Sequence, residues 1–301
     1  MWYGWVSTHM FDRILLPTDG SEAVQPAIEQ ALALAETYDA SLYVLHVVET
    51  AGIPARVAKD ELFDALESEG REAIENIHKQ ASRADIPHVE GSIANGTPYR
   101  AILKRADEHD VDLIVMGTHG RTGVERQLLG STTERVMRRA DAPVLTVQAD
   151  EATTHPYRNV LVPTDGSDCA TDALELGIDV AGANGASLHL LTVVDRGDFG
   201  INLRSDERTT EVNAAATDVV DDATAVAERA GIESVSGTIE TGTSIHQAIR
   251  SYVEENDVDL VVLGTHGRTG VDRYMLGSVT EKFVRTSPVP VLTARKTPTE
   301  S

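Results

Sequence analysis

The chain has 301 residues, of which 48 are acidic and 26 are basic, and its formal net charge is −22. This length predicts two domains, and the acidic field argues against DNA or RNA as a partner. No apolar run approaches the ~20 residues that cross a bilayer. Met1 to Met10 contains no Lys or Arg, which argues against a secretory signal. Cys169 is the only cysteine and so cannot form an internal disulfide. We therefore expect a cytoplasmic protein with no membrane span, disulfide or structural zinc site.

Residues 1–9 have no counterpart elsewhere in the chain, and we interpret them as an N-terminal extension, with a docking segment that uses Trp2 and Trp5 as the alternative. Short apolar runs then alternate with helical patterns, which is typical of βαβ units in a parallel sheet. Ser21 and the Thr97-Pro98 pair are signals for helix starts. The expected strands are 12–17, 41–48, 88–94, 112–116 and 143–148, and the expected helices are 21–38, 56–84, 97–109 and 130–140.

The second part of the chain repeats the first. ILLPTDGS, which begins at Ile14, recurs as VLVPTDGS from Val160, and residues 117–136 recur at 264–283 with 14 of 20 positions identical. Two matches so far apart and nearly in register indicate a duplicated domain. The second set of expected strands is 158–163, 187–194, 233–240, 259–263 and 289–294. The predicted organisation is an extension (1–9), a first domain (10–148), a linker (149–156), a second domain (157–296) and a C-terminal tail (297–301).

Each domain is expected to be a Rossmann-like α/β fold with a doubly wound, five-stranded parallel sheet. A ligand of such a fold binds at the carboxyl ends of the strands, at the topological switch point. Asp19 and Asp165 follow the first strand of each copy, so their carboxylates are expected there. They would be free to accept hydrogen bonds from ribose hydroxyls or to hold a metal through water.

A glycine motif follows the fourth strand of each copy. It begins with Gly117 and Gly120 and ends in Gly130-Ser131, and the second copy begins with Gly264 and Gly267 and ends in Gly277-Ser278. Glycines let backbone N–H groups surround an anion, and the helix that follows would direct its positive end to the same place. The motif therefore predicts a phosphate site, and the added hydroxyl donors are those of Ser131, Thr133, Ser278 and Thr280.

Three segments of the first copy, DRILLPTDGSEAVQPAIEQALALA, GTHGRTGVERQLLGST and APVLTVQ, resemble the universal stress protein family, and the second copy resembles another complete member. The resemblance implies an adenine nucleotide alpha hydrolase-like fold that binds ATP, with Mg²⁺ or Mn²⁺, because G-x2-G-x9-G-[ST] separates the ATP-binding members from the others. It implies a first site made of Pro17, Thr18, Asp19, Val47, Gly117, Thr118, His119, Gly120, Arg121, Gly130, Ser131, Thr132 and Thr133. The second site is Pro163, Thr164, Asp165, Val193, Gly264, Thr265, His266, Gly267, Arg268, Gly277, Ser278, Val279 and Thr280.

The second copy departs from the first at two of the relevant positions, with Thr192 in place of His46 and Val279 in place of Thr132. Contacts made by the backbone would tolerate both changes, so we expect two competent sites.

No Walker motif and no nearby lysine is present, so positive charge at the phosphates would come from Arg121, Arg126, Arg268 or Arg273. The same arginines could instead pair with surface carboxylates. His119 and His266 are interpreted as hydrogen-bonding elements of their turns rather than as general bases.

The resemblance and the residues together predict an ATP-binding stress protein that senses or buffers adenine nucleotide without fast chemistry. One alternative is a slow ATPase or phosphoryl-transfer enzyme, for which the sequence offers no committed base. The other is a scaffold or chaperone-like binder that needs no nucleotide.

Family members commonly pair through their last strand, here 143–148 and 289–294, and such apolar edges favour pairing. We expect an intramolecular pseudo-dimer, to which homodimerisation could be added. The many carboxylates and only five lysines resemble proteins of salt-loving organisms and predict a halophilic source.

Overall fold

The computed structural model describes residues 10–49, 59–120, 129–149, 155–195, 206–265 and 276–294. The chain divides between His155 and Pro156 into two compact units, which we call the first half and the second half. Each half is described by itself. Within the described residues, no helix is both long enough and apolar enough to cross a membrane.

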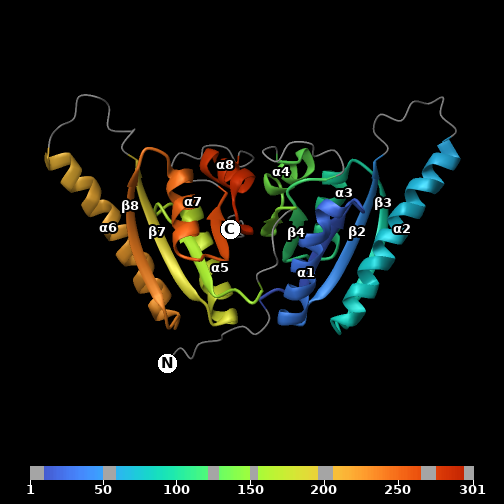
Figure 1. Cartoon of the computed structure of the whole chain (residues 1–301), viewed down its shortest axis with the longest axis horizontal. Coiled ribbons are helices and arrows are strands. Elements are labelled where there is room, and N and C mark those ends of the chain that lie inside the picture. The colour runs from blue at the N-terminus through green and yellow to red at the C-terminus, as the bar shows by residue number, and fades with distance from the viewer. Residues whose placement is uncertain are drawn as a thin grey trace, which may run out of the picture. The chain divides into compact units, whose positions relative to one another are not determined.

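The first half alternates strands and helices (Figure 1). In chain order its elements are β1 (Arg13–Thr18), a 3-10 turn η1 (Glu22–Val24), α1 (Gln25–Tyr38), β2 (Ser41–Glu49), α2 (Lys59–Arg83), β3 (Val89–Gly96), α3 (Pro98–Glu108), β4 (Leu113–Gly117), α4 (Ser131–Met137) and β5 (Val144–Val147). The strands are parallel and lie in the order β3-β2-β1-β4-β5.

The second half repeats this plan. Its elements are β6 (Asn159–Pro163), α5 (Asp168–Asn184), β7 (Ser187–Asp195), α6 (Asp206–Arg229), β8 (Val235–Gly242), α7 (Ile245–Glu255), β9 (Leu260–Gly264), α8 (Ser278–Thr286) and β10 (Val291–Ala294). Its parallel strand order is β8-β7-β6-β9-β10. The predicted fold, two tandem α/β domains with five-stranded parallel sheets, is confirmed.

The central strands are buried because helices cover both faces of each sheet. Ile14, Leu15 and Leu16 are fully buried in succession, which explains why β1 reads as a continuous apolar run rather than an alternating one. In the first half α1 contacts α2, and α3 contacts α4. Right-handed crossovers that run in opposite directions from the middle of the sheet place these two pairs on opposite faces. Figure 1 shows α2 alongside β2 and β3, and α6 alongside β7 and β8.

The expected helix 21–38 begins later than predicted. Ser21 does not cap it, because the Ser21 hydroxyl donates to Asp19 Oδ1 at 2.6 Å, and a 3-10 turn intervenes before α1 starts at Gln25. In the second half, Ser167 Oγ accepts from the N–H of Ala170 at 3.3 Å, and α5 starts directly at Asp168. The same Gly-Ser sequence therefore begins its helix differently in the two halves.

Candidate functional site

The strand order of the first half reverses between β1 and β4. The chain passes from β1 through β2 to β3 on one side, and it returns through α3 to β4 on the other side. Ile14 is in register with Leu113, so both strands end at the same edge of the sheet. This edge therefore carries the switch point at which such folds bind ligands, and Thr18 and Gly117 flank it.

One hydrogen bond ties the end of β4 to the end of β5, and two more hold the start of α4 against the end of β4. The N–H of Thr118 donates to the Val147 carbonyl at 2.9 Å, and the N–H of Gly130 donates to the Thr118 carbonyl at 2.8 Å. The buried hydroxyl of Thr133 donates to the Gly117 carbonyl at 2.9 Å. The Thr133 hydroxyl and the Gly130 N–H thus support the site from within rather than facing a phosphate, which corrects the expectation that Thr133 adds a donor.

The groups that face outward belong to the first turn of α4. Ser131 is exposed and Thr132 is half-buried. The first N–H groups of a helix have no partner within the helix, so the N–H groups of Ser131 and Thr132 suit an anion.

The glycines of the motif leave little room for a side chain, because other atoms of the site lie close to where a Cβ would stand. A Cβ at Gly120 would lie 2.7 Å from Asp19 Oδ2, and a Cβ at Gly130 would lie 3.1 Å from the Thr118 carbonyl oxygen. At Gly117 a Cβ would lie 3.2 Å from the His119 carbonyl oxygen. A side chain at position 120 would therefore press on the turn after β1, whereas a side chain at position 117 or 130 would press on the backbone of the loop after β4 itself.

The Asp19 carboxylate is not free, contrary to expectation. Its Oδ1 accepts from the N–H of Ser21 at 2.9 Å and from the Ser21 hydroxyl at 2.6 Å, which fixes the turn. The N–H of Gly20 donates to Thr18 Oγ1 at 3.1 Å, and the positive φ of 76° at Gly20 explains the glycine there. Only Oδ2 is directed toward the glycine loop, beside Gly120.

The His119 side chain contacts a residue of its own loop. Its Nδ1 lies 2.9 Å from Thr118 Oγ1, and its Nε2 is buried without a hydrogen-bond partner among the described residues. No carboxylate contacts it in the described part of the chain, so the geometry provides no orienting partner of the kind that a general base needs.

The second half builds its site with the same bonds. Gly277 N–H donates to the Thr265 carbonyl at 2.7 Å, and Thr280 Oγ1 donates to the Gly264 carbonyl at 2.8 Å, so Thr280 is also a supporting group. Asp165 Oδ1 accepts from the N–H of Ser167 at 3.0 Å. Ser278 is exposed and Val279 half-buried in the first turn of α8, which matches Ser131 and Thr132.

The two sites differ in how closely the following helix approaches. A Cβ at Gly264 would lie 2.5 Å from the Cys169 carbonyl oxygen, whereas the matching distance from Gly117 to the Ala23 carbonyl oxygen is 3.7 Å. The earlier start of α5 accounts for the tighter contact, because it brings the Cys169 carbonyl directly against the end of β9.

The second strand of each half contributes Val47 and Val193, both half-buried near its carboxyl end. One residue earlier the halves diverge. His46 is buried, and a Cβ at Gly70 of α2 would lie 2.5 Å from its Cδ2. Thr192 instead donates its hydroxyl to the Thr164 carbonyl at 2.9 Å. No sequence pattern pairs Gly70 with His46, although an isolated glycine inside a long predicted helix is a signal of such a close approach.

Several expected site residues lie outside the described residues, namely Arg121, Arg126, His266, Gly267, Arg268 and Arg273. Pro17 is buried and Pro163 is half-buried beneath their turns. Within the described residues, no group of three or more His, Cys, Asp or Glu side chains is placed to hold a metal ion.

Comparison with known proteins decides the family. The model of the universal stress protein family matches residues 10–148 and again residues 156–295. The chain belongs to the universal stress protein family.

Individual relatives agree with this assignment. A universal stress protein of Mycolicibacterium smegmatis is 28% identical over 294 residues, which cover 94% of this chain and 96% of that protein. Universal stress protein MJ0531 of Methanocaldococcus jannaschii is 36% identical over 143 residues, 46% of this chain and 84% of its own length. The crystal structure of a universal stress protein from Archaeoglobus fulgidus covers 94% of this chain and 98% of its own, with 27% identity and a TM-score of 0.73. Similarity thus extends over both halves of this tandem universal stress protein.

Proposed function

We propose that each half of this universal stress protein binds one adenine nucleotide, ATP above all, at the edge where β1 and β4 or β6 and β9 end. The observation that carries the proposal is the closure of the glycine loop on the β1 turn, where a Cβ at Gly120 would lie 2.7 Å from Asp19 Oδ2. A glycine loop that lies this close to the β1 turn, beside a helix start, suits a phosphate chain, and the family resemblance supplies the adenine nucleotide.

The proposed role is sensing or buffering of nucleotide in the cytoplasm rather than fast turnover. No base oriented toward a reacting group is present among the described site residues, because Asp19 fixes its own turn and His119 contacts Thr118. A Mg²⁺ or Mn²⁺ ion would enter with the nucleotide, held mainly by its phosphates, and Asp19 Oδ2 and its counterpart on Asp165 are the carboxylates that could reach it through water.

Nucleotide release and uptake test the proposal. The protein is purified in molar KCl with Mg²⁺, denatured, and any released nucleotide is identified by chromatography, and uptake of added ATP is measured by calorimetry. We expect one adenine nucleotide per half. A protein that is empty and also takes up no ATP would contradict the proposal and favour the scaffold alternative.

Single charges at the two helix starts provide sharper variants than changes of the glycines. Gly130→Val would press on the Thr118 carbonyl and disturb the loop itself. Ser131→Glu and Ser278→Glu instead add an exposed carboxylate to a first helical turn, where it favours the helix but repels phosphate. Each should remove one nucleotide per chain and the double variant both, while the neutral control Ser131→Gln should retain them.

We also propose that the two halves pair through β5 and β10, which are the outermost strands of their own halves. A chain cut within residues 149–156 should then stay together on size exclusion in molar KCl. Halves that separate as folded monomers would contradict the pairing, and the mass of the intact chain by light scattering would show whether a homodimer forms in addition.

A further inference from the structure

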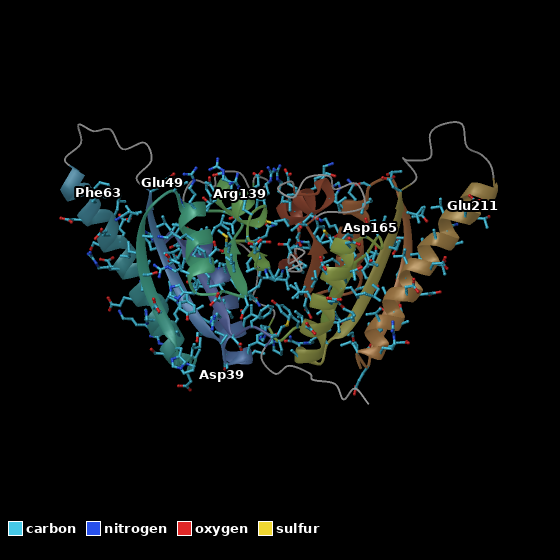
Figure 2. All side chains as sticks on the ribbon, turned by 180° about the vertical axis from the view of Figure 1, so that it is seen from behind. Asp39, Glu49, Phe63, Arg139, Asp165 and Glu211 are labelled. Atoms are coloured by element: carbon cyan, nitrogen blue, oxygen red, sulfur yellow. The ribbon has the colours of Figure 1, made fainter. Side chains whose placement is uncertain are left out.

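An arginine cluster with a tyrosine at its centre lies on the first half. Tyr99 stands in the first turn of α3, which packs against α4. The guanidinium carbons of the cluster lie close to the centre of the Tyr99 ring, at 5.8 Å for Arg100, 5.3 Å for Arg135 and 5.5 Å for Arg139. All three are within cation–π range, so three positive charges share one small surface. In Figure 2, Arg139 lies toward the same end of this half as Glu49, which ends β2, and opposite Asp39.

In the part of the chain that the structure describes, no surface carboxylate pairs with these three arginines. Among the described residues, Arg100, Arg135 and Arg139 form no ion pair, whereas the neighbouring Arg138 pairs with Glu134 at 2.7 Å. The chain has 48 acidic residues against 26 basic ones, so carboxylate partners are plentiful. Three guanidinium groups gathered together repel one another, and an anion bound between them would offset that repulsion.

The second half shows that the fold does not need the cluster. Its α7 and α8 pack together as α3 and α4 do, and the Arg138–Glu134 pair recurs as Arg285–Glu281 at 2.6 Å. The counterparts of the cluster, 147 residues later, are His246 for Tyr99, Gln247 for Arg100, Lys282 for Arg135 and Thr286 for Arg139. One positive charge stands where the first half has three, so helix packing alone does not explain the cluster.

We propose that Arg100, Arg135 and Arg139 bind the polyphosphate chain of an anionic ligand. All three side chains are exposed, and guanidinium forks match phosphate oxygens. Three cations gathered at one ring suit successive phosphates better than they suit one carboxylate. Tyr99 positions the set, since its hydroxyl oxygen accepts from Arg100 Nε at 3.0 Å. That bond also holds the pKa of Tyr99 below its ordinary value.

The position of Arg135 allows the polyphosphate to come from either of two ligands. It follows Ser131 by four residues on α4 and therefore lies on the same helix face as the proposed phosphate contact. The ligand is either the terminal phosphates of a nucleotide in the first-half site, in which case the inference rests on the proposed function, or a separate polyphosphate.

Calorimetric titration of the full chain with inorganic tripolyphosphate at fixed KCl tests the cluster. The double variant Arg135→Gln/Arg139→Gln keeps helix-compatible polar side chains but removes two charges, and we expect at least about tenfold weaker binding from the loss of charge-assisted hydrogen bonds. The matched control Lys282→Gln in the second half should bind like the unaltered chain, and thermal melting checks that all three proteins are folded. Equal tripolyphosphate affinity in the double variant, or no tripolyphosphate binding by the unaltered chain, would overturn the proposal.

Parallel titrations with adenosine and ATP distinguish the two sources. If the double variant also loses the preference for ATP over adenosine, the cluster contacts the bound nucleotide. If only tripolyphosphate binding weakens, the cluster serves a separate polyphosphate. A chain that binds no ATP but binds tripolyphosphate through the cluster would reject the proposed function and keep this inference.

Discussion

The contact between α2 and β2 in the first half permits a direct test of the packing. A Cβ at Gly70 would lie 2.5 Å from Cδ2 and 2.9 Å from Cγ of His46, whose side chain is only 4% exposed. The imidazole would have to move inside a filled site, and overpacking of this kind costs about 1–3 kcal/mol. Alanine in place of glycine inside a helix returns up to about 1 kcal/mol. Gly70→Ala should therefore lower the free energy of unfolding of the first half by up to about 2 kcal/mol.

The second half already contains a pair of residues at these two positions that combines a helix alanine with a smaller strand residue. Thr192 replaces His46, and Ala216 replaces Gly70, at the same separation of 146 residues. In a His46→Thr background the ring is gone, so Gly70→Ala should become neutral or stabilising. The double-mutant cycle should then give a coupling energy of about 1–3 kcal/mol.

The assay is hydrogen exchange of the β2 amides, which reports on the first half, and of the β7 amides, which reports on the second half, with urea unfolding as a second measure. Gly182→Ala in α5 is the matched control, because a Cβ there would meet only Ile232 Cδ1, at an ordinary 3.7 Å. This control should be stabilised by up to about 1 kcal/mol. If Gly70→Ala has the same effect with and without His46, the packing argument is wrong.

Three further outcomes are expected. Thr133→Val should destabilise the first half by about 1–3 kcal/mol in urea unfolding, because it leaves the Gly117 carbonyl without its hydroxyl donor, whereas Thr132→Val should have a small effect. Burial lowers the pKa of His189 below 6.5, so the unfolded chain takes up this proton first and stability falls as the pH drops below 6.5. His189→Gln should remove that part of the pH dependence. If the melting temperatures of the variant and the unaltered protein fall equally as the pH drops below 6.5, this prediction is wrong. With a net charge of −22, the melting temperature should rise between about 0.1 and 1 M KCl, as the Debye length falls from about 10 Å to about 3 Å, and a flat response would contradict the predicted adaptation to salt.

The sequence by itself determined the tandem organisation and the class of fold. Buried parallel strands are continuous apolar runs, as Ile14 to Leu16 illustrates, and this pattern does not depend on knowing which strands are neighbours. The glycine motif also stood out, because positions that exclude a Cβ admit only one residue type. These signals are local, so they can be read along the chain.

The tertiary structure decided which groups of the site are available. Gly130 N–H and the Thr133 hydroxyl look like phosphate donors in the sequence, yet they bond to Thr118 and Gly117, because α4 starts against the end of β4. Asp19 fixes its own turn for a similar reason. The arginine cluster around Tyr99 depends wholly on the packing of α3 against α4, which joins residues far apart in sequence. Hydrogen bonds and charge clusters of this kind are set by distances between elements, and no periodicity along the chain encodes those distances.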